Sequence, residues 1–437
     1  MTVKSVACFW AFCCLLLLSG CSKDQANPRA SRKDGQISIE FWHYQSGPQG
    51  KAIDELLRKF ESANPGIRVR AVFQGNPGQL KQKLDGSFAS GLNNNPAVSL
   101  VYENWADDFV ARGYIEPVQD HFEGPDGLSA EDQRDFVKAF RDGNTWNGKL
   151  MTLPFNKSIY MLYLNMDMLK QAGFTTGPAT QVEYAEMVRK ATIRRNGRTA
   201  AYGMGVIPKG EAMTTLLLAG GGDLVDSAGQ PHLNSPEAVA ALQWLRELQY
   251  PDKCLYVNTD YMSVPFSSKL IASFIYSSAS LPYNQEASQK GGFEYQAVPI
   301  PGVAGKTPRY LMQGTNIAMF ANKSKEEKSA AWKVIRFLTS PENGAYFCAR
   351  SGYMPYRYSM LEQAELKSYM AAHADYATAA RLVLSDQGVQ EPKVRAWEGI
   401  RQEIDKVVDQ ALSRPDADPV ALLNDLQKQA EKRLRQN

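Results

Sequence analysis

Hydrophobic residues recur along the chain with two different periods, and the alternation between them predicts an α/β fold. In the first hundred residues, three apolar strand segments alternate with two segments of helical spacing: Ile37–Trp42, Gly47–Ser62, Ile67–Phe73, Gly78–Ser90 and Ala97–Tyr102. This order predicts right-handed crossovers and a mostly parallel sheet. Ligands of such sheets bind beyond the carboxyl ends of the strands. The chain places Trp42-His43, Gln74 and Glu103 at these ends.

A second feature is the run of β-branched and aromatic residues from Ile159 to Asn165. It predicts a buried strand, which the Pro-containing loop Leu153–Ser158 leads into. We expect this strand to carry the chain from one lobe into another, and Leu311–Asn316 to cross a second time. Asn156 and Ser158 would then lie at the mouth of a cleft between the lobes.

The same two periods continue to the end of the chain. Helices are expected at Gln181–Ile193, Ser235–Gln249, Lys325–Leu338, Glu342–Arg350, Val394–Leu412 and Val420–Arg435, and strands at Tyr202–Val206, Leu270–Tyr276 and Phe293–Pro301. With 437 residues the chain exceeds an ordinary single domain, so two domains are expected.

The first 36 residues differ in composition from the rest. Val6–Leu18 is an apolar run of signal-peptide length, and Leu18-Ser19-Gly20-Cys21 matches a lipoprotein box. We therefore expect residues 1–20 to be a lipoprotein signal peptide and 21–36 a flexible tether that begins at a lipidated Cys21. An ordinary signal peptide with an incidental cysteine is the alternative. Acyl chains on Cys21 would hold the protein on a membrane outside the cytoplasm, in the periplasm or at the cell surface.

Composition narrows the class of protein. With 44% hydrophobic and 22% charged residues the chain matches soluble globular proteins. The formal net charge of +3 is nearly neutral for this length and argues against a nucleic-acid partner. In an extracytoplasmic protein Cys254 and Cys348 either pair in a disulfide or stay as two buried thiols, and spacing alone does not decide between them.

A search for catalytic and metal-binding motifs leaves only weak candidates. The four histidines are scattered without ligand spacing, so no metal or cofactor is predicted. There is no Gly-x-Ser-x-Gly elbow, and a carboxylate pair such as Glu103 with Asp107 is the one pattern that would suit glycoside hydrolysis. Small polar residues in predicted loops are better suited to holding an oxyanion without reacting with it. They are Ser158, Ser277, Gly314, Tyr353 and Arg395.

From Ile37 to its end the chain resembles the extracellular solute-binding proteins of ABC importers, family 1, of the maltose-binding type. Within that family it is most similar to the glycerol-3-phosphate-binding branch. The matching stretches are Phe41-Trp42-His43, Val101-Tyr102-Glu103, Pro154-Phe155-Asn156-x-Ser158 with Leu162-Tyr163-x-Asn165-x-Asp167, Ser277-Ser278-x-Ser280-Leu281 and Ser351-Gly352-Tyr353-Met354-Pro355.

The resemblance implies the two-lobed periplasmic-binding-protein fold, with the ligand cleft between the lobes. Lobe 1 would comprise residues 37–155 and 314–353, and lobe 2 residues 156–313 and 354–437. It implies a monomeric binding protein rather than an enzyme, which closes on a phosphorylated polyol or sugar and delivers it to membrane permease subunits. A sugar- or oligosaccharide-binding protein of the same fold is the alternative, followed by a lipoprotein hydrolase.

The resemblance also implies roles for individual residues. Glu103 would bind glycerol hydroxyls, while Ser158, Ser277, the backbone of Gly314, Tyr353 and an arginine would surround the phosphate. Arg395 is the best match for that arginine and Arg401 the second choice. Two departures alter the glycerol end: Pro77 replaces a tyrosine of the relatives, and Met204–Lys209 replaces a tryptophan-rich loop. Both leave room for a glycerophosphodiester such as glycerophosphocholine.

Overall fold

The computed structural model describes residues 35–91, 94–207, 209–226, 229–258, 261–393 and 396–436. The predicted signal peptide, Cys21 and Arg395 lie outside these ranges. Residues Ile37–Asn437 form one compact unit, and the predicted division into two lobes stays a prediction. Among the described helices, none combines the length and the apolar character that crossing a bilayer requires.

The first half of the sheet follows the predicted order. β1 (Ile37–His43) runs parallel to both β2 (Ile67–Phe73) and β3 (Val98–Val101). The connecting helices are α1 (Gly47–Ala63) and α2 (Pro77–Ala89). Each predicted segment here is confirmed to within a few residues. The strand ends therefore meet at one edge of the sheet, where Glu103 begins α3 (Glu103–Ala111).

A long central strand, β7 (Leu153–Asn165), is buried over all 13 of its residues. The prediction that Leu153–Ser158 is a loop was wrong, because these residues already pair with β14 (Tyr310–Phe320). Pro154 lies beside the irregularity between Thr315 and Asn316, where the pairing shifts register. A proline, which has no N–H to donate, is tolerated at such a position.

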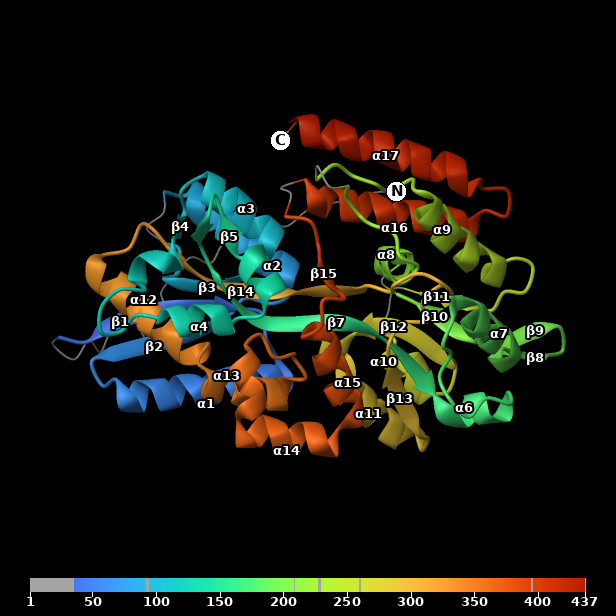
Figure 1. Ribbon diagram of the computed structural model, residues 1–437, viewed down its shortest axis with the longest axis horizontal. Helices are drawn as coiled ribbons and strands as arrows, with labels where there is room; N and C mark the ends of the chain where they lie inside the picture. Colours follow the sequence, from blue (N-terminus) through green and yellow to red (C-terminus); the bar gives the residue numbers. More distant parts are fainter. Residues whose placement is uncertain are drawn as a thin grey trace, which may run out of the picture. The chain divides into compact units, whose positions relative to one another are not determined.

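β7 and β14 join the two halves of the sheet (Figure 1). The strand order is β11-β10-β12-β7-β14-β3-β1-β2, with β11 at Leu255–Val257, β10 at Met204–Val206 and β12 at Ser273–Ser277. β14 runs antiparallel to β3 and to the start of β7. The later part of β7 pairs antiparallel with β12 (Ser273–Ser277) and β13 (Tyr295–Val298). The sheet is therefore mixed, and the expected parallel pairing describes β1 to β3 but not its centre.

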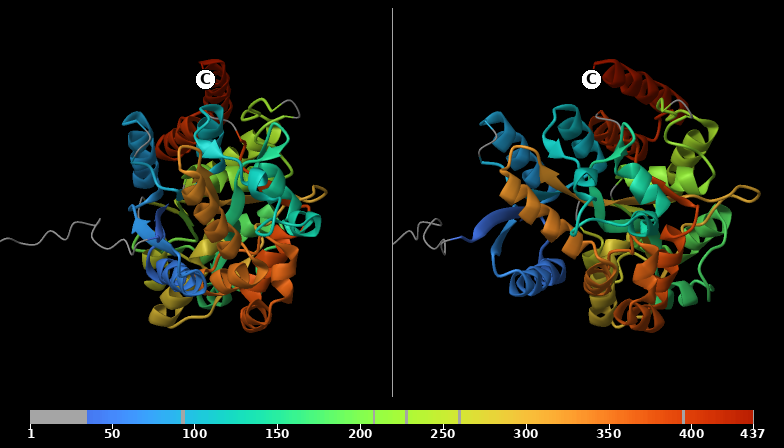
Figure 2. Two further views of the ribbon diagram at one scale, coloured as in Figure 1. Left: turned by 90° about the vertical axis from the view of Figure 1, so that its left-hand side faces the viewer. Right: turned by 60° about the vertical axis from the view of Figure 1, so that its left-hand side comes forward.

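Helices α8 (Lys209–Ala219), α9 (Pro236–Gln249), α16 (Trp397–Ser413) and α17 (Pro419–Gln436) pack on one another beside the second half of the sheet (Figures 1 and 2). The sequence analysis did not predict α8. Every residue from Gly210 to Ala219 is buried, so this helix has no polar face to produce a 3.6-residue period.

The remaining elements connect or cover these parts. They are β4 (Ile115–Glu116), η1 (Val118–His121), α4 (Ala130–Asp135), α5 (Lys138–Gly143), β5 (Thr145–Trp146), β6 (Lys149–Leu150), α6 (Met166–Gln171), α7 (Gln181–Ala191), β8 (Ile193–Arg195), β9 (Arg198–Ala201), β10 (Met204–Val206), β11 (Leu255–Val257), α10 (Ser263–Ser267), η2 (Ser278–Ser280), α11 (Leu281–Gly291), α12 (Lys325–Leu338), α13 (Pro341–Ser351), η3 (Tyr358–Glu362), α14 (Ala364–Ala372), α15 (Ala374–Val383) and β15 (Gly388–Gln390).

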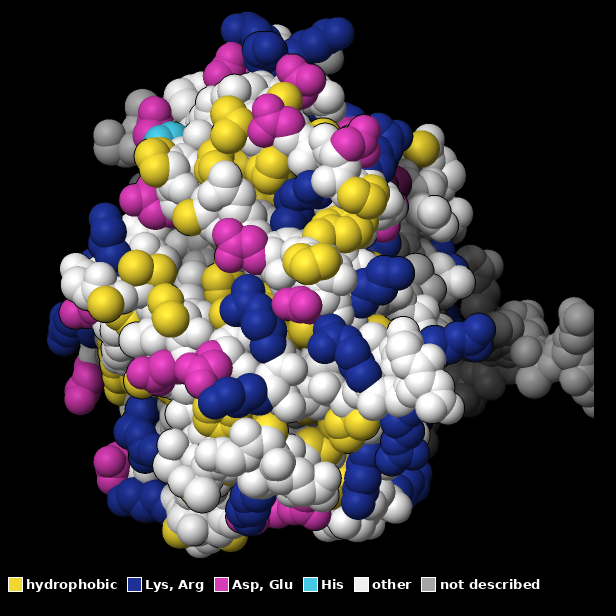
Figure 3. Space-filling view, turned by 90° about the vertical axis from the view of Figure 1, so that its right-hand side faces the viewer, with side chains coloured by type: hydrophobic (Ala, Val, Ile, Leu, Met, Phe, Trp, Pro, Cys, Tyr) yellow, Lys and Arg dark blue, Asp and Glu magenta, His cyan; other side chains and the backbone are white. Residues whose placement is uncertain are grey.

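The state of the two cysteines can be checked on side chains. Cys254 and Cys348 are both buried and free, which confirms the thiol alternative over the disulfide. On the face that carries α6, α7 and α9, side chains of both charge signs are interspersed with hydrophobic ones (Figure 3). Several of them are paired, as in Lys170–Glu294 and Lys190–Glu186.

Candidate functional site

Four of the predicted site residues, Glu103, Ser158, Gly314 and Tyr353, come together around Lys157 on β7. Lys157 Nζ donates to Glu103 Oε1 at 2.5 Å and lies 3.4 Å from the Gly314 carbonyl oxygen. The Met354 N–H, one residue after Tyr353, donates to the Lys157 carbonyl at 2.7 Å. We refer to Glu103, Lys157, Ser158, Gly314 and Tyr353 as the crossing cluster.

The centre of the crossing cluster is a buried ion pair. The Lys157 side chain is 1% exposed and that of Glu103 is 11% exposed. Burial lowers the pKa of Lys157, and the Glu103 carboxylate partly offsets this. Glu103 is the first residue of α3, and a helix N-terminus stabilises a carboxylate. A carboxylate has about four acceptor positions, so the ion pair leaves Glu103 able to accept from ligand hydroxyls.

Gly314 allows the two central strands to come close at this point. Its φ is +123°, and a Cβ added there would lie 2.0 Å from the Asn156 carbonyl oxygen. Gly314 is paired with Lys157 in the β7–β14 ladder. A larger residue would displace the strand that carries Lys157 and Ser158.

Hydroxyl and amide groups from several loops extend the crossing cluster. The hydroxyls of Tyr44 and Tyr102 are 3.4 Å apart, and Asn156 Nδ2 donates to Tyr44 Oη at 3.0 Å. Gln45 Nε2 donates to Tyr353 Oη at 3.1 Å. Burial raises the pKa of all three tyrosines, so their hydroxyls stay neutral and can both donate and accept.

Ser277 has a local structural role. Its hydroxyl accepts from the Ala279 N–H at 3.2 Å and caps η2, which is the capping function that serines often have at helix starts. The loop still adjoins the crossing cluster, because a Cβ added at Gly352 would lie 3.5 Å from the Ser278 carbonyl oxygen. Ser278 also accepts from the Ile159 N–H at 3.1 Å. Segments from both halves of the sheet therefore meet here.

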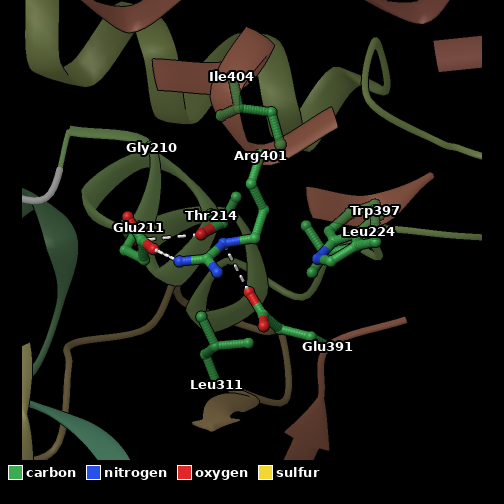
Figure 4. A pocket seen from close by; sticks show the side chains of 9 residues that line it. All are labelled: Gly210, Glu211, Thr214, Leu224, Leu311, Glu391, Trp397, Arg401 and Ile404. Atoms are coloured by element: carbon green, nitrogen blue, oxygen red, sulfur yellow. Dashed lines mark hydrogen bonds and ion pairs between the residues drawn. The ribbon is translucent and has the colours of Figure 1, made fainter. Parts of the chain in front are cut away.

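Arg401 on α16 forms ion pairs with Glu211, Glu391 and Glu398, and we refer to these four residues as the arginine cluster. Figure 4 shows Arg401 with two of its partners, Glu211 and Glu391. The Arg401 Nε lies 3.1 Å from Glu391 Oε1, and the Arg401 Nη1 lies 3.5 Å from Glu398 Oε2. Burial acts to lower the pKa of Arg401, but the Glu391 and Glu211 carboxylates outweigh it and the net change is upward. Burial raises the pKa of Glu391, although Arg401 opposes this. The adjoining cavity, about 10 Å³, has room for about one water molecule.

Gln313 links the two clusters. Its Nε2 donates to Glu391 Oε1 at 2.9 Å, its Oε1 accepts from Tyr160 Oη at 3.2 Å, and its carbonyl lies 3.4 Å from Ser158 Oγ. On the α3 side, Asn104 Nδ2 donates to Glu398 Oε2 at 3.3 Å. Arg395 lies outside the described residues. Arg401, the second choice, is linked to Ser158 through Glu391 and Gln313.

Sequence reasoning missed several of these groups. Lys157 occupies the unspecified position of the Pro-Phe-Asn-x-Ser motif, and its signal was a charged residue inside an otherwise apolar buried run. Tyr44 and Gln45 directly follow Trp42-His43, the strand end that the sequence analysis did name. Glu211 and Glu391 gave no local signal, because only tertiary packing brings them to Arg401.

Comparison with known proteins places this geometry in context. A family model described as bacterial extracellular solute-binding protein matches residues 55–374. The sn-glycerol-3-phosphate-binding periplasmic protein UgpB of Salmonella typhimurium is 27% identical over 394 residues, or 86% of each chain. UgpB of Escherichia coli K12 is 27% identical over 363 residues, or 80% of this chain and 81% of that protein.

Solved structures show the same fold. UgpB from Mycobacterium tuberculosis in complex with glycerophosphocholine has a TM-score of 0.81 at 24% identity and covers 92% of this chain and 99% of its own. MalE from Bdellovibrio bacteriovorus bound to maltotriose has a TM-score of 0.75 at 21% identity, covering 91% and 100%. These similarities confirm the predicted α/β periplasmic-binding-protein fold of the maltose-binding type.

Proposed function

The chain belongs to the bacterial extracellular solute-binding protein family, and we propose that its ligand is of the glycerophosphate type, either glycerol-3-phosphate or a glycerophosphodiester. As a member of this family it is the substrate-binding component of an ABC importer, which binds a small molecule outside the cytoplasm for delivery to a permease. It is therefore not an enzyme, and the hydrolase alternative falls away.

The observation that carries the proposal is the crossing cluster. The carboxylate of Glu103 at the start of α3 pairs with Lys157, whose Nζ also lies near the Gly314 carbonyl. Glu103 can accept hydrogen bonds from a polyol, while Ser158, Tyr353 and Lys157 can donate to its phosphate. The relatives named for sn-glycerol-3-phosphate binding, at 27% identity, support the same class of ligand.

Arg401 is our candidate for the anion-binding arginine. In the structure its guanidinium is held by three glutamates, so a phosphate must replace at least one of them. Glu391 suits this exchange, because burial raises the pKa of its carboxyl and so lowers the cost of protonating it when a phosphate approaches. A protonated Glu391 can also donate a hydrogen bond to a phosphate oxygen.

Closure of the predicted lobes would let one ligand contact Glu103 and Arg401 at the same time. The Asn104–Glu398 hydrogen bond already joins α3 to α16, and Ser278 approaches Gly352 from the other half of the sheet. A ligand that touches both sides favours the conformation in which both contacts exist together, so binding shifts the population toward it. Acyl chains on Cys21 would hold this binding protein near the permease.

A calorimetric titration tests the proposal. Glycerol-3-phosphate and glycerophosphocholine are titrated into the wild type and into Glu103→Gln, Arg401→Gln and Arg395→Gln variants. We expect saturable binding of at least one ligand, with affinity lowered at least about tenfold by Glu103→Gln and by Arg401→Gln. Arg112→Gln, which alters only an exposed pair with Asp108, serves as the control and should bind normally.

Two results would contradict this proposal. The first is the absence of binding for both glycerophosphate ligands to the wild type. The second is unchanged affinity in both the Glu103 and the Arg401 variants. If Arg395→Gln loses binding while Arg401→Gln binds as tightly as the wild type, the anion-binding role belongs to Arg395.

One observation favours a neutral saccharide as the second candidate. Three carboxylates surround a single guanidinium in the arginine cluster, so this region carries excess negative charge. Planar amides and tyrosine hydroxyls near Tyr44 suit sugar hydroxyls, and MalE of the same fold is bound to maltotriose. Maltotriose included in the same titration distinguishes the two, because its binding should not weaken when Arg401 is replaced.

A further inference from the structure

A cavity of about 250 Å³ lies at the corner between α14 and α15, away from Glu103 and Arg401. Tyr369 lines it from α14, and Asp375 and Tyr376 line it from α15. His373 lines it from the junction of these helices, and Tyr295 from β13. Ala372 and Ala374, which also line it, are exposed, so the cavity is open to solvent. Neither the proposed ligand nor the predicted site residues occupy this place.

The walls of this corner cavity are aromatic. The Tyr369 and Tyr376 rings meet edge to face, with centroids 4.9 Å apart and planes at 81°. The His373 ring lies 4.2 Å from that of Tyr369. The Tyr295 hydroxyl is close enough to Asp375 for that carboxylate to raise its pKa, in addition to burial. A cation within about 6 Å of such rings is attracted by their negative faces.

The corner cavity also holds the carboxylate of Asp375. Among the described residues, no lysine or arginine forms an ion pair with it, and its pKa is shifted by burial and the Ala297 N–H rather than by a cation. Burial raises the pKa of Asp375 to about 6, partly offset by the Ala297 N–H. At neutral pH Asp375 is therefore charged and half-buried.

We propose that the corner cavity binds a small organic cation of the ammonium type, with Asp375 as its counter-ion and the rings of Tyr295, Tyr369 and Tyr376 as its walls. A cation there would pair with the Asp375 carboxylate and gain cation–π attraction from the rings. The site is separate from the proposed ligand site but close to it, because Tyr376 Oη donates to the Tyr353 carbonyl at 2.7 Å.

Tetramethylammonium is a suitable probe, because it carries the charge and lacks hydrogen-bonding groups. Its titration at constant ionic strength and neutral pH, followed by NMR chemical shifts of the full protein, should saturate with a dissociation constant of about millimolar order. tert-Butanol has a similar shape without the charge and should bind at least about fivefold more weakly, which corresponds to the loss of about 1 kcal/mol of cation–π attraction.

Substitutions distinguish the contribution of the Asp375 charge to tetramethylammonium binding from that of the aromatic rings. Asp375→Asn and Tyr369→Leu should each weaken tetramethylammonium binding at least about fivefold, whereas Tyr369→Phe should retain it because the ring remains. Asp386→Asn is the matched control, since Asp386 is an exposed carboxylate just beyond α15. Circular dichroism confirms that each variant is folded.

The inference is overturned if tetramethylammonium gives no saturable shift, if tert-butanol binds equally well, or if Asp375→Asn leaves binding unchanged. The first two outcomes need only the wild type, so they do not depend on the stability of a variant. None of these results bears on glycerophosphate binding, which is tested through Glu103 and Arg401.

Discussion

Lys157 is a single residue on which the local arrangement depends. Its side chain is almost completely buried, pairs with Glu103 and lies against the Gly314 carbonyl, all within a strand of otherwise mostly apolar character. A buried ion pair contributes little net stability, but removal of one partner leaves the other charge desolvated and unpaired. Lys157 therefore positions Glu103 as well as neutralising it.

We predict that Lys157→Met lowers the free energy of unfolding by about 3–5 kcal/mol, because Glu103 loses its counter-ion. The double variant Lys157→Met, Glu103→Gln should recover part of this loss, since no buried charge remains. Urea denaturation of both variants measures the difference. Lys149→Met, which removes an exposed pair with Asp120, is the control and should cost less than about 1 kcal/mol. An equally small effect at Lys157 would show that the pair is solvated.

Asp375 predicts a pH dependence of stability at the residue scale. Its pKa is raised by burial from 3.8 to about 6 in the folded protein. A carboxyl whose pKa is raised on folding stabilises the folded state most at low pH, and this contribution is lost as pH rises through about 6. The melting temperature of Asp375→Asn relative to the wild type should therefore increase between about pH 4 and pH 7. If the melting temperatures of the two proteins change in parallel with pH, Asp375 does not contribute to the pH dependence of stability.

At the scale of elements, the pairing of β7 with β14 depends on one glycine. Gly314 has a positive φ, and any side chain there would collide with the Asn156 carbonyl. We expect Gly314→Ala to destabilise the protein by more than the conformational cost alone, which is about 1–2 kcal/mol for a residue forced to positive φ. Thermal and urea unfolding measure the change.

Gly148→Ala provides the comparison for Gly314→Ala. Gly148 also has a positive φ, +76°, but nothing lies within 4 Å of its added Cβ. Its substitution should show the conformational cost without the collision. If the two variants lose the same stability, the close approach of β7 and β14 at Gly314 is not a tight constraint.

Element boundaries were predicted well where one face of a helix or strand is polar. Lys325–Leu338 and Ile67–Phe73 match α12 and β2 residue for residue. The Ser324–Glu327 capping box, present in the structure, marks the start of α12 by local hydrogen bonds alone. Elements buried on all sides, such as α8 and the first half of β7, lack this alternation and were missed or taken for a loop.

At the scale of the whole molecule, hinge closure predicts that ligand binding makes the protein more compact. If ligand contacts from both predicted lobes form together, saturation with the glycerophosphate ligand should lower the radius of gyration measured by small-angle X-ray scattering. Asn104→Ala removes the α3–α16 hydrogen bond. It should therefore reduce the fraction of ligand-free molecules that are in the closed conformation. An unchanged radius of gyration on saturation would contradict closure.

The sequence by itself determined the α/β class, most elements, the family resemblance and the residues Glu103, Ser158, Gly314 and Tyr353, because periodicity and short motifs are local properties of the chain. Only the tertiary structure decided that Lys157 neutralises Glu103, that three glutamates hold Arg401, and that Asp375 shares a cavity with Tyr295, Tyr369 and Tyr376. Several of these contacts join residues far apart in sequence, as Lys157–Glu103 and Arg401–Glu211 show. Their electrostatic consequences arise from burial, which no local pattern encodes.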